Sequence, residues 1–162
     1  MKTLNAKELS SLPAKIAGPG YDRASLTPGI LHIGVGNFHR AHMAHYLDRL
    51  FEMGKGHDLA IVCAGVREGD ARMRKSLLEQ DCLTTVVDLA PNGLSARVIG
   101  SMIDFVQIDP TATIAAMCSP AIRIVSMTIT EGGYYVDAKT NGFDAAHPDM
   151  LADAANIGDP QS

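Results

Sequence analysis

Short runs of apolar residues alternate along the chain with segments whose apolar positions recur every three or four residues. The apolar runs are nearly continuous, which is typical of strands buried on both faces of a parallel sheet. They lie at residues 30–35, 59–66 and 122–129. The helical spacing predicts helices over 38–53, 70–80 and 111–118, and Asp109 followed by Pro110 supplies a cap and a first-turn proline for the last of these.

Two further strands are predicted between the second and third helices, over 83–89 and 96–105. The connecting residues Ala-Pro-Asn-Gly have good turn chemistry, so the pair is expected to form an antiparallel hairpin. The whole pattern predicts an α/β fold, a doubly wound and mostly parallel sheet with an inserted β-hairpin. We expect an irregular arm over 1–28, a dinucleotide-binding domain over 29–136 and an irregular tail over 137–162, with one short helix near its end.

The chain has 162 residues, which is room for one domain and not for two. The formal net charge of -4 argues against a nucleic-acid-binding surface, which needs a basic patch. Three cysteines without a C-x-x-C pair indicate neither a disulfide framework nor a zinc knuckle. No signal peptide and no membrane-spanning run is recognisable. The expectation is a cytoplasmic protein with neither nucleic acid nor membrane as partner.

A glycine turn, Gly34-Val35-Gly36, follows the first predicted strand and opens the first helix. The first glycine permits a tight turn, and the second lets the backbone approach a pyrophosphate whose charge meets the free N–H groups of the helix. His39 stands where the usual fingerprint has its third glycine, so a plain strand-to-helix turn is an open alternative. A methyltransferase turn is disfavoured, because methyltransferase folds expect their third glycine at the position that Phe38 occupies here.

Acidic residues follow the second predicted strand, where a carboxylate can accept hydrogen bonds from the hydroxyls of an adenosine ribose. Glu68 and Asp70 occupy this place and favour NAD as the cofactor. Arg67 beside them would attract an added 2′-phosphate, which leaves NADP open. Asp70 has a second interpretation as the N-cap of the following helix, and the two roles can coexist.

Three stretches in order resemble one enzyme family: ILHIGVGNFHRAHMAHYLDRL, VIGSMIDF and SPAIRIVSMTITEGGYY. The first is similar to the cofactor-binding motif G-x-G-x-F-H-R-A-H of the long-chain polyol dehydrogenases, the mannitol 2-dehydrogenase family. The resemblance runs from about Gly29 to Tyr135 and implies a Rossmann-like cofactor domain. The residues that it and the two patterns above assign to NAD are Gly34, Gly36, Asn37, Phe38, His39, Arg40, Arg67, Glu68, Asp70, Thr128, Thr130, Glu131 and Gly132.

By this resemblance the chain is the cofactor-binding part of an enzyme that moves a hydride from C2 of a sugar alcohol such as D-mannitol to NAD, giving the ketose. The family's catalytic lysine lies on a K-x-x-x-x-N-x-x-H helix of a second domain, and that spacing does not occur here. We therefore expect no catalytic residue in this chain and no turnover by it alone. The alternatives are a hexuronate (fructuronate or tagaturonate) reductase of the same family, disfavoured by His39 and His42, and a non-catalytic NAD-binding module.

The histidines at 39, 42 and 45 recur every third residue and suggest a metal site at first sight. On a helix, the first and third of them lie about 120° apart around the axis, so the three cannot converge on one ion. No cysteine or carboxylate partner stands at a suitable spacing. The prediction is zinc-independent chemistry with no metal site.

Overall fold

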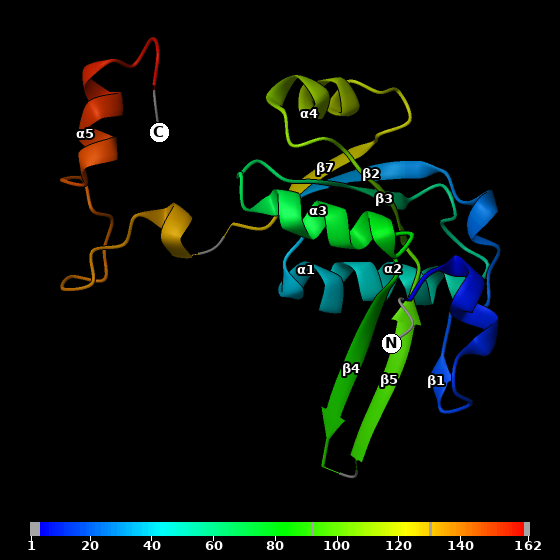
Figure 1. Ribbon diagram of the computed structural model, residues 1–162. Coiled ribbons are helices and arrows are strands. Elements are labelled where there is room, and N and C mark those ends of the chain that lie inside the picture. The colour runs from blue at the N-terminus through cyan, green and yellow to red at the C-terminus, as the bar shows by residue number, and fades with distance from the viewer. Residues whose placement is uncertain (1–3, 92, 130, 161–162) are drawn as a thin grey trace. The chain divides into compact units, whose positions relative to one another are not determined.

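The computed structural model describes residues 4–91, 93–129 and 131–160 (Figure 1). The chain forms two compact units, Met1–Thr128 and Ile129–Ser162, which are described separately. The three-stranded and the four-stranded sheet both belong to the first unit. The second unit contains a 3-10 helix, η3 (Glu131–Tyr134), an isolated bridge between Val136 and Phe143, and helix α5 (Pro148–Ala155) near the end of the predicted tail.

The main sheet of the described first unit has four parallel strands: β2 (Pro28–Ile33), β3 (Ala60–Ala64), β6 (Met102–Phe105) and β7 (Ile124–Met127). Their order across the sheet is β6-β3-β2-β7. Counted by appearance within this sheet, the order is 3-2-1-4, which is the strand order of a dinucleotide-binding doubly wound fold. The predicted fold class is therefore confirmed.

Helices cover both faces of this sheet (Figure 1). One face carries α1 (Asn37–Ala41), α2 (Met43–Glu52) and α3 (Asp70–Glu79), and the opposite face carries α4 (Pro110–Met117). Asp109 caps α4 by accepting a hydrogen bond from the Ala112 N–H, as its sequence predicts. The predicted helix over 38–53 is instead interrupted at His42, whose backbone leaves helical geometry at φ -116° and ψ -85°.

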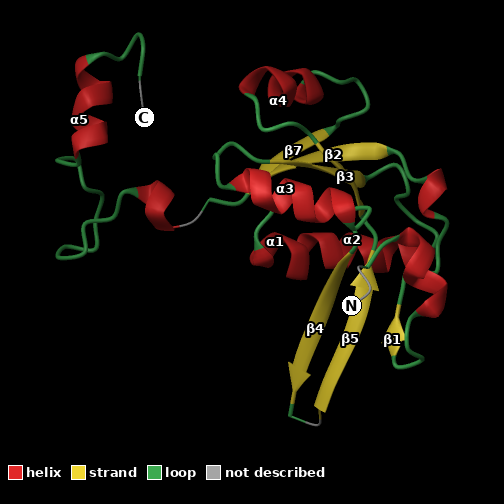
Figure 2. Cartoon of the chain, in the orientation of Figure 1, coloured by secondary structure: helices red, strands yellow, loops and turns green. Residues whose placement is uncertain are grey.

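The hairpin is present as β4 (Thr84–Ala90) and β5 (Gly93–Ile99), paired antiparallel (Figure 2). The prediction of one continuous strand over 96–105 is wrong, because β5 ends at Ile99 and Met102–Phe105 joins the main sheet beside β3. The break is stabilised by contacts from distant residues: the Gly100 N–H donates to Asp48, and the Ser101 hydroxyl donates to the Ala44 carbonyl. Nothing local in the sequence signals these bonds.

The amino-terminal arm is more ordered than its composition suggests. It contains the 3-10 helices η1 (Ala6–Ser11) and η2 (Arg23–Ser25) and the two-residue strand β1 (Ile16–Ala17). Strand β1 pairs in parallel with β5, so the smaller sheet has the order β1-β5-β4. The arm is thus hydrogen-bonded to the base of the hairpin.

Strand β7 borders the main sheet within the described residues. Its apolar side chains Ile124, Val125 and Met127 are about half exposed, in contrast to the buried residues of β2 and β3. A parallel strand is normally covered on both faces.

Among the described residues, no helix is long and apolar enough to span a membrane.

A buried carboxylate joins helix α2 to the hairpin and the arm. Asp48 is fully buried and accepts hydrogen bonds from the Tyr21 hydroxyl at 2.6 Å and from Arg97 Nε at 2.8 Å. Arg97 also donates to Glu52 at 2.6 Å. Burial, and then the neighbouring Asp48 carboxylate, raises the pKa of Tyr21 well above its usual value. Because Asp48 is fully buried, its carboxylate depends on these donors rather than on water.

We expect Asp48→Ala to lower the free energy of unfolding by about 3 kcal/mol, since it leaves Arg97 Nε, the Tyr21 hydroxyl and the buried Gly100 N–H without their common acceptor. Urea denaturation of the 162-residue chain measures this change. The matched control is Asp58→Ala, which removes the exposed partner of Arg123 and should change stability little. Equal effects of the two substitutions would contradict the structural role assigned to Asp48.

Candidate functional site at the carboxyl edge of the parallel sheet

The carboxyl ends of β2, β3 and β7 meet at one edge of the main sheet. The Gly34 N–H, just after β2, donates to the carbonyl of Ala64 at the end of β3, at 3.1 Å. On the other side, the Thr128 N–H donates to the Ile33 carbonyl at 3.0 Å. The glycine turn therefore lies between its two neighbouring strands, at the switch point of the sheet where ligands of such folds bind.

Gly34 is required by the fold itself. Its φ of +92° is a conformation that side chains other than glycine rarely adopt, and a Cβ there would lie 3.1 Å from the Thr128 carbonyl oxygen. The tight turn and the close approach of Thr128 together explain the first glycine.

Gly36 is different, because nothing in the described fold requires a glycine there. Its φ of -82° suits any residue, and a Cβ would have no described heavy atom within 4 Å. Gly36 is the N-cap of α1, and the first N–H groups of a helix have no acceptor within it. The open space above this residue lets a phosphate approach the backbone directly, so the turn fits a pyrophosphate.

The predicted residues that follow the turn lie around its open side. Asn37 and Phe38 are exposed, and Phe38 stacks on His42 with ring centroids 4.4 Å apart. Arg40 folds back over the turn, where its guanidinium donates to Asn37 Oδ1 at 2.5 Å and to the Gly36 carbonyl at 3.4 Å. A guanidinium has five N–H donors, so Arg40 retains donors for an anion.

His39 does not share this open position. Its side chain is 1% exposed, and its ring stacks on His32 of β2 with centroids 3.7 Å apart and an interplanar angle of 9°. Burial, assisted by the nearby His32 and the positive charge of Arg40, lowers the pKa of His39 to about 3. The side chain is therefore neutral at pH 7, and it is buried against β2 rather than exposed on the open side of the turn.

The residues after β3 form a compact loop around Asp70. One carboxylate oxygen, Oδ2, accepts hydrogen bonds from the backbone N–H groups of Val66 and Arg67, both at 3.0 Å. The interpretation of Asp70 as an N-cap is wrong, because Gly69 is the N-cap of α3 and Asp70 is its first residue. Oδ1 accepts no hydrogen bond from the residues that the structure describes, so it is available to a ribose hydroxyl. Arg67 and Glu68 are exposed beside it.

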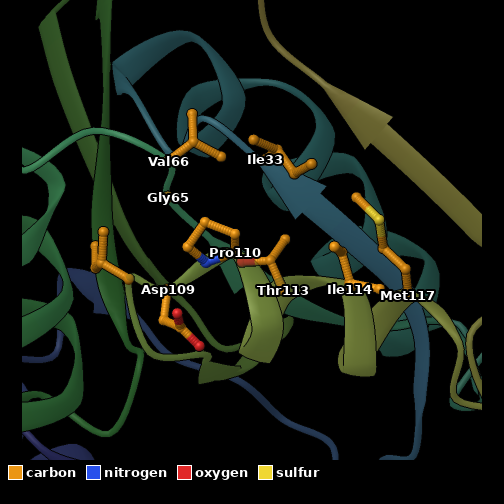
Figure 3. Close-up of a pocket in the computed structure, with 9 residues that line it drawn as sticks. Ile33, Gly65, Val66, Asp109, Pro110, Thr113, Ile114 and Met117 are labelled. Carbon is orange, nitrogen blue, oxygen red and sulfur yellow. The ribbon is translucent and has the colours of Figure 1, made fainter. Parts of the chain in front are cut away.

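A mostly apolar pocket of about 230 Å³ lies at the same edge, against α4 (Figure 3). Its lining residues are Ile33, Gly65, Val66, Ile108, Asp109, Pro110, Thr113, Ile114 and Met117. Sequence reasoning missed this pocket. It treated 96–105 as one strand of a hairpin and so did not place the loop after β6 beside the end of β3. The sequence signal that was present is the pair of apolar residues Met102 and Phe105 just before that loop.

Besides Thr128, which directly follows β7, three more predicted cofactor residues lie beyond this strand. Thr130 lies outside the described residues. Glu131 and Gly132 begin η3 in the second unit, so they are described only within that unit. Their assignment to the cofactor stays a prediction. No group of three or more His, Cys, Asp or Glu residues able to hold a metal ion occurs in the part of the chain that the structure describes.

Comparison with known proteins finds a matching family model and relatives whose names agree with it. Residues 28–157 match the family model described as mannitol dehydrogenase Rossmann domain. The chain is 59% identical over 147 residues to a mannitol 2-dehydrogenase of Cereibacter sphaeroides, covering 90% of this chain and 31% of the relative. It is 41% identical over 164 residues to a polyol:NADP oxidoreductase of Gluconobacter oxydans, covering 98% and 33%.

A solved relative is the Pseudomonas fluorescens mannitol 2-dehydrogenase in a ternary complex with NAD and D-mannitol. It is similar with a TM-score of 0.80 and 41% identity, over 98% of this chain and 33% of that one. The chain thus spans about a third of the length of the relatives it matches. The family resemblance inferred from the sequence motifs is confirmed.

Because the pKa of His39 is lowered, the unfolded chain takes up a proton below pH 6.5 that the folded chain does not bind. The stability linked to this residue is present above pH 6.5 and is lost as the pH falls toward 3. Between about pH 7 and pH 5, we expect the unfolding free energy of the unmodified chain to fall by about 2 kcal/mol more than that of the His39→Leu variant. Urea denaturation at the two pH values tests this, and parallel losses in both chains would contradict it.

Proposed function

Since this chain belongs to the mannitol dehydrogenase family, we propose that it binds NAD at the carboxyl edge of its parallel sheet. We propose further that it is the cofactor-binding part of a polyol 2-dehydrogenase, which oxidises a sugar alcohol such as D-mannitol to the corresponding ketose. Activity, substrate and partners are proposals, because the chain matches only about a third of each relative.

The observation that carries the proposal is the open space above Gly36. A glycine at φ -82° with no described atom near its absent Cβ is not needed for folding. It is needed where a ligand phosphate must contact the backbone. It follows β2 at the switch point of the sheet, where the strand order reverses between β2 and β7 and where a dinucleotide crosses a doubly wound sheet.

The contacts assigned to NAD follow the edge of the sheet. The first N–H groups of α1 and the Arg40 guanidinium bind the pyrophosphate, and Oδ1 of Asp70 accepts from the adenosine ribose. The apolar pocket against α4 takes the adenine ring, because aromatic bases favour mostly apolar clefts with few polar groups. Thr128, Thr130, Glu131 and Gly132 are assigned to the remaining part of the cofactor.

Bound NAD supplies an acceptor for the hydride that leaves C2 of the alcohol. The hydroxyl proton needs a separate base, and we assign no residue of this chain to that role. The chain's own contribution is to orient the cofactor through the turn, Asp70 and the pocket. A cytoplasmic location remains a prediction from composition.

Two alternatives remain from the sequence. Of these, a hexuronate reductase is disfavoured, because the relatives carry names that mention mannitol or polyols. The other is a non-catalytic NAD-binding module, which would share the same cofactor contacts. The open reading frame around this sequence separates the module from the enzyme, because an enzyme needs a continuing chain with a catalytic lysine helix.

We expect Gly36→Ser to weaken NADH binding at least about tenfold, because its side chain occupies the open space above the turn. Stability should be unchanged, since serine is a preferred N-cap. Calorimetric titration and thermal melting of the same samples measure the two effects. Gly34→Ala is the matched contrast: strain at φ +92° should lower its melting temperature. Unaltered NADH affinity in Gly36→Ser would refute the proposed pyrophosphate site.

We expect tighter binding of NADH than of NADPH, because the Asp70 carboxylate repels a 2′-phosphate. Asp70→Asn should lower the ratio of the NADPH to the NADH dissociation constant at least about threefold. The substitution keeps an oxygen for the Val66 and Arg67 N–H groups. Glu79→Gln, at the far end of α3, serves as the control for the loss of one negative charge. Comparable affinities of the unmodified chain for both cofactors would remove the role given to Asp70.

A further inference from the structure

Two buried imidazoles lie next to the glycine turn, and the contacts given to NAD under the proposed function do not use either ring. His32 of β2 is 3% exposed and His39 of α1 is 1% exposed. Their rings are nearly parallel at 9°, with centroids 3.7 Å apart, which is face-to-face contact. A stacked pair of polar rings is an unusual occupant of the space between a helix and a buried strand.

His39 sets the spacing between α1 and β2. In the usual dinucleotide turn the third glycine allows the helix to pack directly on the strand. Here the space between helix and strand is filled by two ring planes. Neither nitrogen of the His39 ring has a hydrogen-bond partner among the described residues, so the ring is held by its shape and by stacking. The height of the helix start above β2 therefore depends on the stacked rings.

His32 links the turn to β7. Its Nδ1 lies 2.9 Å from the Ser126 hydroxyl, and its Nε2 lies 3.1 Å from the Thr128 hydroxyl. A neutral imidazole has one donor and one acceptor nitrogen, and hydroxyls can serve either role, so both bonds are satisfied. Thr128 in turn forms the wall of the turn, with its carbonyl 3.1 Å from the position of a Gly34 Cβ.

These contacts form one continuous chain from α1 through both rings to Thr128 and Gly34. We propose that His32 and His39 are positioning residues for cofactor binding: their stack holds the start of α1 and the Thr128 wall at the separation that a pyrophosphate requires. The proposal rests on the proposed function, since it concerns the same turn. Neither side chain contacts the cofactor itself.

The test compares two ligands that use different parts of the site. ADP-ribose needs the pyrophosphate turn, whereas adenosine needs only the pocket and Asp70. We expect His39→Leu to weaken ADP-ribose binding at least about fivefold and to change adenosine binding less than twofold, as measured by calorimetric and NMR titration. Equal weakening of both ligands, or no weakening of either, would overturn the proposal, because general damage to the fold does not discriminate between them.

A second pair of variants isolates the hydrogen bonds of His32 and decides the matter if His39→Leu does not fold. Thr128→Val and Ser126→Ala each remove one hydroxyl bonded to the same ring, but of the two residues it is Thr128 that packs against Gly34. Only Thr128→Val should weaken the binding of ADP, which carries the pyrophosphate but lacks the part of the cofactor that is assigned to Thr128 itself. Where His39→Leu does fold, the double variant of His39→Leu and Thr128→Val should bind no more weakly than the poorer single variant, because both act through one contact chain. Equal effects of the two hydroxyl variants, or additive losses in the double variant, would overturn the proposal.

Ligand binding by the unmodified chain distinguishes a failure of this proposal from a failure of the proposed function. If it binds neither ADP-ribose nor NADH, the cofactor site itself is wrong. If it binds both ligands and the variants above show no selective loss, the site stands and only the positioning role of the two histidines fails.

Discussion

The arrangement of the site depends on the parallel pairing of β2 with β3 on one side and β7 on the other. Parallel strands bring their carboxyl ends to the same edge, so the segments that follow them meet there. The close fit of Ala64, Gly34 and Thr128 requires a residue without a side chain at φ +92°. The turn, the Asp70 loop and the pocket against α4 are all positioned by this pairing.

Polar side chains inside this fold are stabilised in two contrasting ways. Asp48 is paired with Arg97, the Tyr21 hydroxyl and the Gly100 N–H, and so it joins α2, the hairpin and the arm. His39 instead has no described hydrogen-bond partner and relies on its contact with His32. A charge cannot be buried without partners, whereas a neutral ring can be kept by packing when its pKa is lowered.

Most elements could be predicted from the sequence because their signals are local. Buried parallel strands such as β2 are continuous apolar runs, and Asp109 with Pro110 marks the start of α4. The failure at 96–105 has a non-local cause. Residues 100 and 101 form hydrogen bonds with Asp48 and Ala44, about fifty positions earlier in the chain, and these end β5 and redirect the backbone into the main sheet. The pocket was missed for the same reason.

By itself, the sequence determined the α/β alternation, the glycine turn, the acids after the second strand and the family, because each of these is a pattern of neighbouring residues. Tertiary structure alone decided which glycine serves the fold and which leaves room for a ligand, since that depends on what surrounds an absent Cβ. It also placed His39 against His32 rather than at the open turn. The physical reason is that a motif specifies local backbone geometry, whereas burial and contact arise only when distant segments pack together.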